Sequence, residues 1–405
     1  MCSFYFLPQL WEVGRKYGMQ TEPDFFMVRY GSKYLAGFVA IVGFIFIIPY
    51  VQLQLTGLGI IVTVASFDAI SRTTAMVIAV VIVAAFVFAS GIRAVAWVGV
   101  LKDFLMLTAA VVIGIGIPYI YFGGIGNMFS ALIHAKPAHL VMPGATKTMG
   151  HAWFISTVLL TSFGFYMWPH TMVATFTAKS SNTIRRNACI MPLYSITLPL
   201  IFFVGLAALL VLPGLPNGDL ALLAMVRKSF PAWFLGVVGG AGALTAMVPA
   251  AMLLLVAATL FSKNFIRPIF APSMTDDQVA KLARVLVVII SALALYFAIH
   301  SSPTLVQLLL LGYAGMTQFL PGVLLGLYWK RVNLTGVFTG MFFGVLMVAF
   351  LVLTKRDPFL GINAGFFSLC VNFVITVLVS LVTPAQRSGF DDSSQVSVKN
   401  EAIYK

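Results

Sequence analysis

One histidine lies in the middle of an apolar stretch, directly after a proline, where an ionisable side chain needs a polar partner. The stretch reads FYMWPHTMVATF and contains Trp168, Pro169 and His170 in succession. Proline has no backbone donor and leaves a carbonyl of the preceding turn unpaired, so a helix kinks or breaks there. Two interpretations are open. The histidine is a neutral member of a kinked core helix, or it and Trp168 line a cavity at a broken helix and contact a solute or form a gate.

A lysine and an aspartate stand next to each other in a second apolar stretch, VAWVGVLKDFLMLTAA. Lys102 and Asp103 lie about one and a half turns into an expected span that begins near residue 96, just after the cytoplasmic Arg93, counting 3.6 residues per turn. An ionisable group inside a membrane span is costly, so it is a candidate for function by default. The alternative is structural: Lys102 extends to the membrane interface, and Asp103 pairs with it or with a neighbour.

Two further stretches carry amides and tyrosines among apolar residues. Tyr50 and Gln52 occur in IIPYVQLQLTGLG, and Tyr313 and Gln318 occur in LLLGYAGMTQFLPGVLLGLYWKR. Amides in hydrocarbon pair with neighbouring helices, so contacts between helices compete with solute contact as an explanation. Several spans with proline, glycine and amides together favour a solvated path through a helical bundle.

The elements that position these residues are membrane-spanning helices. Hydrophobic residues make up 60% of the 405 residues, and only 9% are charged, whereas soluble chains carry roughly a quarter. A span needs about 20 apolar residues, and lipid requires every backbone group to be paired internally. The fold class is therefore an all-α polytopic membrane protein. We expect ten full spans, near 36–62, 73–91, 96–122, 150–177, 188–212, 232–262, 283–300, 303–329, 334–354 and 364–383.

The distribution of basic residues predicts the orientation. Placing residues 10–35 in the cytoplasm puts 17 of the 25 Lys and Arg residues on the cytoplasmic side, as the positive-inside rule requires. Both termini are then cytoplasmic, and the localisation is the cytoplasmic (inner) membrane. Residues 1–383 form a single transmembrane domain, and 384–405 form a polar tail without periodicity that we expect to be disordered.

Other classes fit less well. The net charge of +13 comes from basic residues spread singly or in pairs along short connections, so no nucleic-acid partner is expected. The three cysteines are far apart and lack metal-ligand spacing, so no metal site is expected. An enzyme needs a convergent set such as paired acids or serine with histidine, and the spans supply one aspartate, one lysine and one clear histidine. We predict no enzymatic activity and no cofactor.

Five motifs in order resemble the sodium/solute symporter family over nearly the whole chain. They are GRKYGMQTEPDFFMVRYGS, SGIRAVAWVGVLKD, WPHTMVATFTAKSSNTIRRNA, LTAMVPAAMLLLVAATLFSKNF and PGVLLGLYWKRVNLTG. Their spacing is most similar to a branch that carries small monocarboxylates. The resemblance implies a five-plus-five inverted-repeat bundle like that of the leucine-type transporters, with alternating access around a site at the membrane midplane. It also implies that His170 is an inner-gate or solute-contacting residue.

Two departures from the family pattern matter. Family members begin with two further helices, and this chain starts in the tail of the next one, so it resembles a chain truncated at its N-terminus. Where the family reads Ala-x-Met-Ser-Thr-x-x-Ser, this chain has Val248 and Pro249 in place of the two hydroxyl residues. The family's Thr-Asp on the sodium path aligns with Val98 and Gly99, and a nearby amide aligns with Lys102. The sodium site is therefore degenerate: it lacks side chains that line the family's sodium path, which argues against coupling of transport to sodium.

Because both parts of the family's sodium site have changed, we hypothesise that Lys102 supplies the positive charge that sodium supplies in the family. The coupling ion is then a proton or sodium. The expected function is a secondary transporter of a small organic solute, such as a monocarboxylate or an amino acid, within the lipid bilayer. A non-transporting fragment and a membrane sensor on the same fold are the alternatives. Solute, stoichiometry and oligomeric state do not follow from the sequence.

Overall fold

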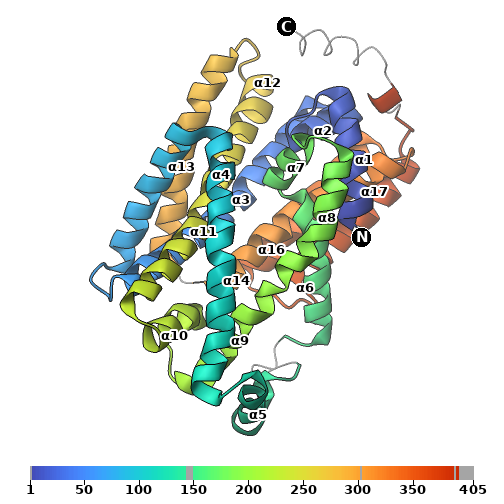
Figure 1. Cartoon of the computed structure of the whole chain (residues 1–405). Helices are drawn as coiled ribbons and strands as arrows, with labels where there is room; N and C mark the ends of the chain where they lie inside the picture. The colour runs from blue at the N-terminus through green and yellow to red at the C-terminus, as the bar shows by residue number, and fades with distance from the viewer. Residues whose placement is uncertain (1, 143–148, 302, 387–388, 392–405) are drawn as a thin grey trace.

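Helices form the whole framework of the computed structural model, which describes residues 2–142, 149–301, 303–386 and 389–391. No strand occurs in these described ranges, where the only β-type pairing is an isolated bridge between Phe359 and Ile362. Figure 1 shows the helices in a long bundle. The first half comprises α1 (Cys2–Tyr17), α2 (Glu22–Tyr30), α3 (Lys33–Ala65), α4 (Arg72–Phe122), α5 (Ile125–Ala135), η1 (Pro137–His139), α6 (His151–Gly164), η2 (Phe165–Met167), α7 (Pro169–Phe176), α8 (Ser181–Ser195) and α9 (Thr197–Val211).

The second half continues the same pattern of long helices joined by short turns. It comprises η3 (Gly218–Leu220), α10 (Ala221–Ser229), α11 (Ala232–Thr259), the π-helix η4 (Leu260–Ile266), α12 (Arg267–Ile269), α13 (Asp276–His300), α14 (Leu305–Met316), η5 (Thr317–Phe319), α15 (Leu320–Tyr328), α16 (Leu334–Leu353), α17 (Ala364–Val382) and η6 (Gly389–Asp391). Within the described ranges, eight helical stretches are long and apolar enough to cross a membrane. The fold class is thus confirmed as all-helical and polytopic, while the count of ten spans stays a prediction.

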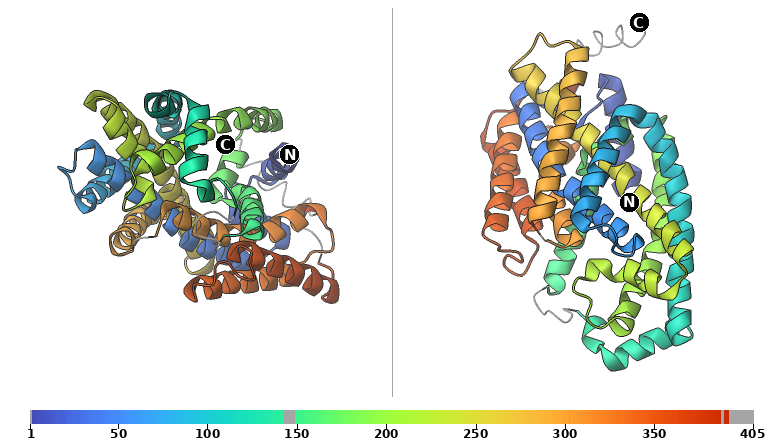
Figure 2. Two further views of the ribbon diagram at one scale, coloured as in Figure 1. Left: turned by 90° about the horizontal axis from the view of Figure 1, so that it is seen from below. Right: turned by 90° about the vertical axis from the view of Figure 1, so that its left-hand side faces the viewer.

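The predicted spans 73–91 and 96–122 belong to one uninterrupted helix, α4. A straight helix of its 51 residues would be about 77 Å long, more than twice the hydrocarbon thickness of about 30 Å. The ribbon bends over, however, so that its two limbs run in opposite directions (Figures 1 and 2). Each limb can then cross the membrane separately. The turn expected between the two spans is therefore a bend in continuous helix.

The predicted span 150–177 is broken in the middle. α6 ends at Gly164, a 3-10 turn follows, and α7 begins at Pro169. Trp168 has extended backbone angles, φ −70° and ψ 129°, because the residue before a proline is driven out of the helical region. Proline is well tolerated as the first residue of a helix, where its missing donor has no partner to lose. This confirms the break that the sequence predicted.

α16 and α17 pack closely at the margin of the bundle (Figure 2). Glycines four residues apart on α16 face polar side chains on α17. A Cβ at Gly340 would overlap the hydroxyl of Thr376 and approach the carbonyl oxygen of Asn372 to 2.8 Å. The absence of side chains at these glycines lets the two backbones meet, as small residues do in membrane helix pairs.

Part of the C-terminal tail is ordered on the rest of the protein. The phenol of Tyr17 donates to the backbone oxygen of Phe390 at 2.6 Å, and the Phe390 ring lies against Tyr17 and Phe25. Gln386 donates to the carbonyl of Tyr30 at 2.9 Å. These contacts place Gln386 and Phe390 against α1 and α2, and the disorder expected for 384–405 stays a prediction. Residues 387–388 and 392–405 lie outside the described ranges.

Candidate functional site

Four of the predicted site residues come together at the break between α6 and α7. The ring centroids of Tyr50 and Trp168 are 4.9 Å apart, and those of Trp168 and His170 are 5.7 Å apart. Tyr50 and His170 are separated by 6.2 Å, and Tyr313 meets Trp168 edge-on at 5.4 Å. We call these four residues the aromatic cluster. It joins α3, the start of α7, and α14, three elements that are far apart in the sequence.

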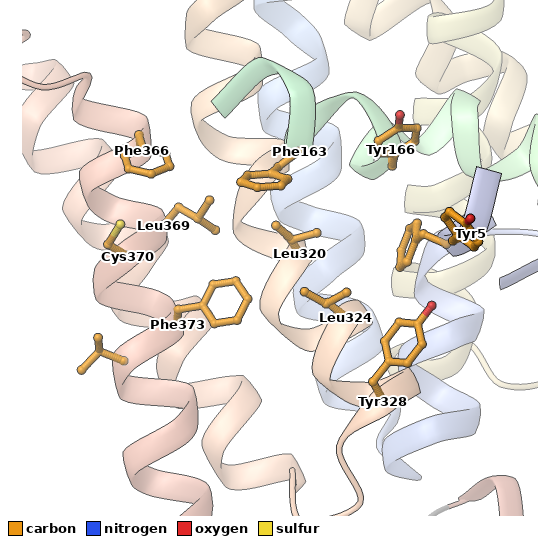
Figure 3. A pocket seen from close by; sticks show the side chains of 12 residues that line it. Tyr5, Phe163, Tyr166, Leu320, Leu324, Tyr328, Phe366, Leu369, Cys370 and Phe373 are labelled. Carbon is orange, nitrogen blue, oxygen red and sulfur yellow. The ribbon is translucent and has the colours of Figure 1, made fainter. Parts of the chain in front are cut away.

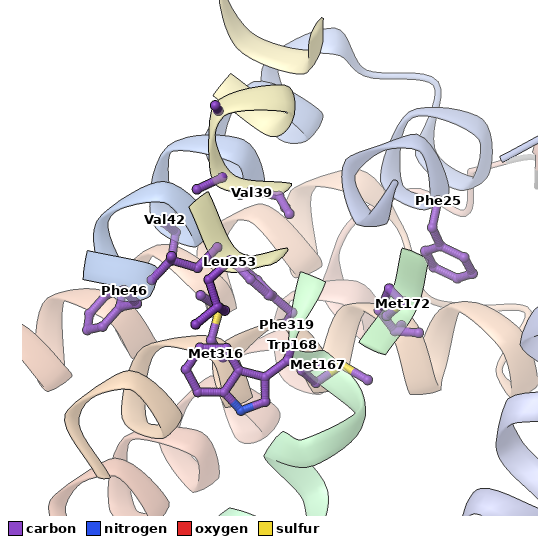
Figure 4. Packing of buried hydrophobic residues seen from close by; sticks show 14 of the residues in the cluster. Phe25, Val39, Val42, Phe46, Met167, Trp168, Met172, Leu253, Met316 and Phe319 are labelled. Atoms are coloured by element: carbon purple, nitrogen blue, oxygen red, sulfur yellow. The ribbon is translucent and has the colours of Figure 1, made fainter. Parts of the chain in front are cut away.

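A glycine on α14 makes room for the cluster. A Cβ at Gly312 would lie 2.6 Å from the indole of Trp168, so any larger residue would displace that ring. Figure 4 shows the indole among Met167, Met316 and Phe319. Trp168 is only 2% exposed. Tyr50, His170 and Tyr313 are half-buried, so the indole is the most enclosed member of the cluster.

His170 brings to the cluster a buried polar atom that lacks a hydrogen-bond partner. Its Nδ1 is buried and has no hydrogen-bond partner among the described residues. A buried nitrogen without a partner costs about 1 to 3 kcal/mol, so such a group is retained where a ligand or water completes it. The imidazole can donate or accept one hydrogen bond at this position. This is the property required of a residue that contacts a polar solute.

Gln52 and Gln318 lie elsewhere. Residues two apart on a helix point about 200° apart, so Gln52 faces away from Tyr50, and its amide donates to the Ser301 hydroxyl at 2.9 Å. Gln318 is fully buried and donates to the carbonyl of Ala314 at 3.0 Å. The amide of Asn372 donates to the backbone oxygen of Gln318 at 2.8 Å. Both glutamines tie helices together here, which is the structural alternative that the sequence left open.

Lys102 pairs with its neighbour. Its ammonium lies 2.9 Å from the carboxylate of Asp103, whose side chain is 45% exposed, while that of Lys102 is 16% exposed. Tyr194 donates to the same carboxylate at 3.5 Å. Among the described residues, this is the only ion pair of Lys102. The geometry is that of an interfacial pair, and the hypothesis that Lys102 replaces sodium stays a prediction.

The degenerate sodium position lies within a continuous helix. α11 runs through Val248 and Pro249, both half-buried, without a break. Pro249 has no backbone N–H, so the carbonyl of Thr245 lacks its usual helical donor and is available as a ligand. The Thr245 hydroxyl donates to the carbonyl of Ala241 at 2.7 Å. Gly99, the other aligned position, is half-buried, and a Cβ there would meet nothing within 4 Å.

A cavity of about 630 Å³ lies between α1, α6, α15 and α17, and none of the four cluster residues lines it. Figure 3 shows its lining, in which Phe163 and Tyr166 come from the segment just before Trp168. The other walls include Leu324 and Phe373, and the hydroxyls of Tyr5 and Tyr328 are among its few polar groups. This lining suits an apolar occupant better than a charged one.

Sequence reasoning missed a polar network that joins α2 to the π-helical end of α11. The Thr21 hydroxyl donates to the Asn264 oxygen at 3.0 Å, and the Asn264 amide donates to Asp24 at 2.9 Å. Lys263 pairs with Asp24 at 3.3 Å. Burial alone would raise the pKa of Asp24, but Lys263 and hydrogen bonds from Gln20, Asn264 and Thr21 lower it overall. A polar loop gives no apolar-span signal, which is why these residues escaped notice.

The comparisons with known proteins agree with this architecture. The sequence model of the Sodium:solute symporter family matches residues 3–344. The Bacillus subtilis protein "Uncharacterized symporter YhjB" is 39% identical over 97% of this chain and 82% of its own length. A monocarboxylate transport permease of Rhizobium johnstonii is 28% identical over 95% of this chain and 79% of its own length. A solved Na+-coupled sialic acid symporter has a TM-score of 0.72 at 18% identity, covering 95% of this chain and 81% of that one.

The chain belongs to the sodium:solute symporter family. Family membership and the fold support a multi-pass membrane protein that acts as a secondary transporter of small solutes rather than as an enzyme. Membership of a family of sodium:solute symporters favours sodium as the coupling ion. The resemblance seen in the sequence is therefore confirmed.

Proposed function

We propose that this protein moves a small organic solute, most simply a monocarboxylate, across the cytoplasmic membrane by alternating access around the aromatic cluster. The observation that carries the proposal is the unpartnered buried Nδ1 of His170 at the break of a membrane helix. Transporters bind solutes at broken helices near the bilayer midplane. The similarity to a monocarboxylate permease supports a carboxylate solute.

Uptake into proteoliposomes tests this function. Labelled monocarboxylates and amino acids are offered separately, with sodium and pH varied independently. We expect saturable uptake of at least one short monocarboxylate and none in protein-free vesicles. Amino acids taken up in place of monocarboxylates would refute the solute assignment, and a lack of uptake of every compound would favour the non-transporting fragment.

We further propose that sodium couples weakly, because Val248 and Pro249 contribute no side-chain oxygen where the family has two hydroxyls. Restoring them in the double variant Val248→Ser and Pro249→Thr is expected to lower the sodium concentration for half-maximal uptake about tenfold, equivalent to about 1.4 kcal/mol of binding. Uptake rates measured over a range of sodium concentrations give this half-maximal value. The matched control is Gly205→Ser, on α9, where a Cβ would have nothing within 4 Å. Wild-type uptake that saturates at low sodium and is unchanged in the double variant would contradict weak coupling.

The Lys102 hypothesis has its own test. If the ammonium substitutes for sodium, Lys102→Met should abolish uptake measured without sodium, because the charge next to the site is lost. If Lys102 only forms the interfacial pair with Asp103, uptake should change less than about threefold, since partly exposed ion pairs contribute about 0 to 1 kcal/mol. Initial rates in sodium-free buffer separate the two outcomes. Wild-type uptake that strictly requires sodium would reject the hypothesis without the variant.

A further inference from the structure

One acidic side chain outside the membrane spans is completely buried. Glu22, the first residue of α2, has 0% exposure, and neither of its carboxyl oxygens has a hydrogen-bond partner among the described residues. An ionised carboxylate in such a place costs several kcal/mol even after the protein relaxes, unless a charge or donors compensate it. The side chain is therefore held as the neutral acid.

The neighbouring charges are committed to other partners. On its own helix, Asp24 pairs with Lys263 of η4, and the guanidinium of Arg29 donates to the Gly326 carbonyl at 2.7 Å. On α3, Lys33 donates to the carbonyl of Pro268 at 3.4 Å.

The other elements that pack on α2 bring little charge. α7 contributes the imidazole of His170, α15 carries no charged residue, and η6 carries Asp391, whose side chain is not among those described. Burial is the single cause that raises the pKa of Glu22 well above its usual range.

The burial of Glu22 depends on how α2 is docked. Thr21 and Asp24 flank it in the sequence and bind Asn264 at the π-helical end of α11. Further along α2, the Tyr30 hydroxyl donates to the Gly322 carbonyl of α15 at 2.6 Å, and Phe26 packs against Phe319. α2 also packs on α7, which begins at the aromatic cluster. Any movement of these helices that opens a path along α7 must loosen α2.

We propose that Glu22 is a proton-binding site controlled by the docking of α2: the carboxylate takes up one proton when α2 docks and releases it when α2 undocks. The site opens to the side of the membrane on which residues 10–35 lie. Its meaning for the transport cycle rests on the proposed function, whereas its existence does not. A site of this kind makes undocking sensitive to pH on that side.

The sign of the effect follows from linkage. Docking is fully favoured below the ordinary carboxyl pKa of about 4.3, where both states hold the proton. As pH rises from there towards the raised pKa of the docked state, the undocked state loses its proton first. Each pH unit in this window multiplies the undocked population about tenfold.

Hydrogen exchange of the amides in α2 measures the undocked population without any solute. The wild type is compared at pH 5.5 and 6.5 with Glu22→Gln, which copies the neutral acid and cancels the intrinsic pH dependence of exchange. The ratio of wild-type to variant exchange rates is expected to rise with pH, by at most about tenfold across this unit. The control Glu12→Gln, at an exposed position on α1, should follow the wild type. A ratio that stays constant would overturn the proposal.

A second measurement needs no variant and covers the case in which Glu22→Gln does not fold. An apolar carbodiimide modifies protonated buried carboxyls, and mass spectrometry locates the label. We expect label on Glu22 of the intact protein at pH 7. Glu12, whose side chain is exposed to water, should stay unlabelled by the apolar reagent. Absence of label on Glu22 at pH 5.5 as well as at pH 7 would contradict the site. If Glu22 is labelled but the proteoliposomes take up no solute, the proton-binding site is supported and the proposed transport function is rejected.

Discussion

Replacement of His170 by alanine is expected to raise the solute concentration for half-maximal uptake about 10- to 100-fold. The reason is that one hydrogen bond from a buried imidazole to a polar or charged solute contributes about 1.5 to 3 kcal/mol once water is excluded. His170 is the residue of the aromatic cluster with a buried nitrogen left free, at Nδ1. Concentration dependence of initial uptake rates provides the measurement.

A structural role for the histidine predicts a different pattern. A kinked core helix that loses an imidazole becomes less stable, so the amount of folded protein falls while the half-saturating concentration is kept. Thermal unfolding of the purified protein therefore accompanies the kinetics. His134→Ala, at an exposed position on α5, is the matched control and should alter neither quantity. An unchanged half-saturating concentration in folded His170→Ala protein would remove His170 from the solute site.

Substitution of Gly340 by leucine is expected to lower the midpoint of thermal unfolding by about 3 °C or more. A Cβ there meets the Thr376 hydroxyl and the Asn372 backbone, and overpacking of this kind costs about 1 to 3 kcal/mol or more. The substitution also strains a buried polar network, since the Thr376 hydroxyl donates to the Asn372 side chain at 3.1 Å. Asn372 in turn holds Gln318.

The control for this prediction is a glycine with free space around it. Gly205→Leu on α9 adds a side chain where a Cβ would meet nothing within 4 Å, and its midpoint should stay within about 2 °C of wild type. Unfolding is followed by fluorescence in detergent and repeated in lipid nanodiscs. Equal midpoints for the two variants would show that the contact between α16 and α17 does not limit stability.

The all-helical membrane fold and the break before α7 could be predicted from the sequence, because both follow from local chemistry. Apolar length determines what can cross a membrane, and Pro169 forces the residue before it out of the helical region. The fold-back of α4 was anticipated as two spans but not as continuous helix. Apolar periodicity marks which residues are buried without indicating whether the backbone between two spans stays helical.

The partners of polar side chains were less accessible to prediction. Helical spacing separates the face of Tyr50 from that of Gln52, but nothing local shows that the first meets Trp168 and the second meets Ser301. Glu22 gave no signal, since a carboxyl in a polar loop is ordinarily solvated. Its burial arises from the packing of α2 on helices that are distant in the sequence, and only the three-dimensional structure reveals it.

Solute counterflow in proteoliposomes tests alternating access most directly. Vesicles loaded with a high concentration of unlabelled solute are diluted into a trace of labelled solute, with equal sodium and pH on both sides. We predict a transient accumulation of label above equilibrium, because a carrier with one site exchanges solute without net driving force, and we predict its loss in His170→Ala. A monotonic rise to equilibrium without overshoot, or an overshoot unaffected by the substitution, would contradict a solute site at the aromatic cluster.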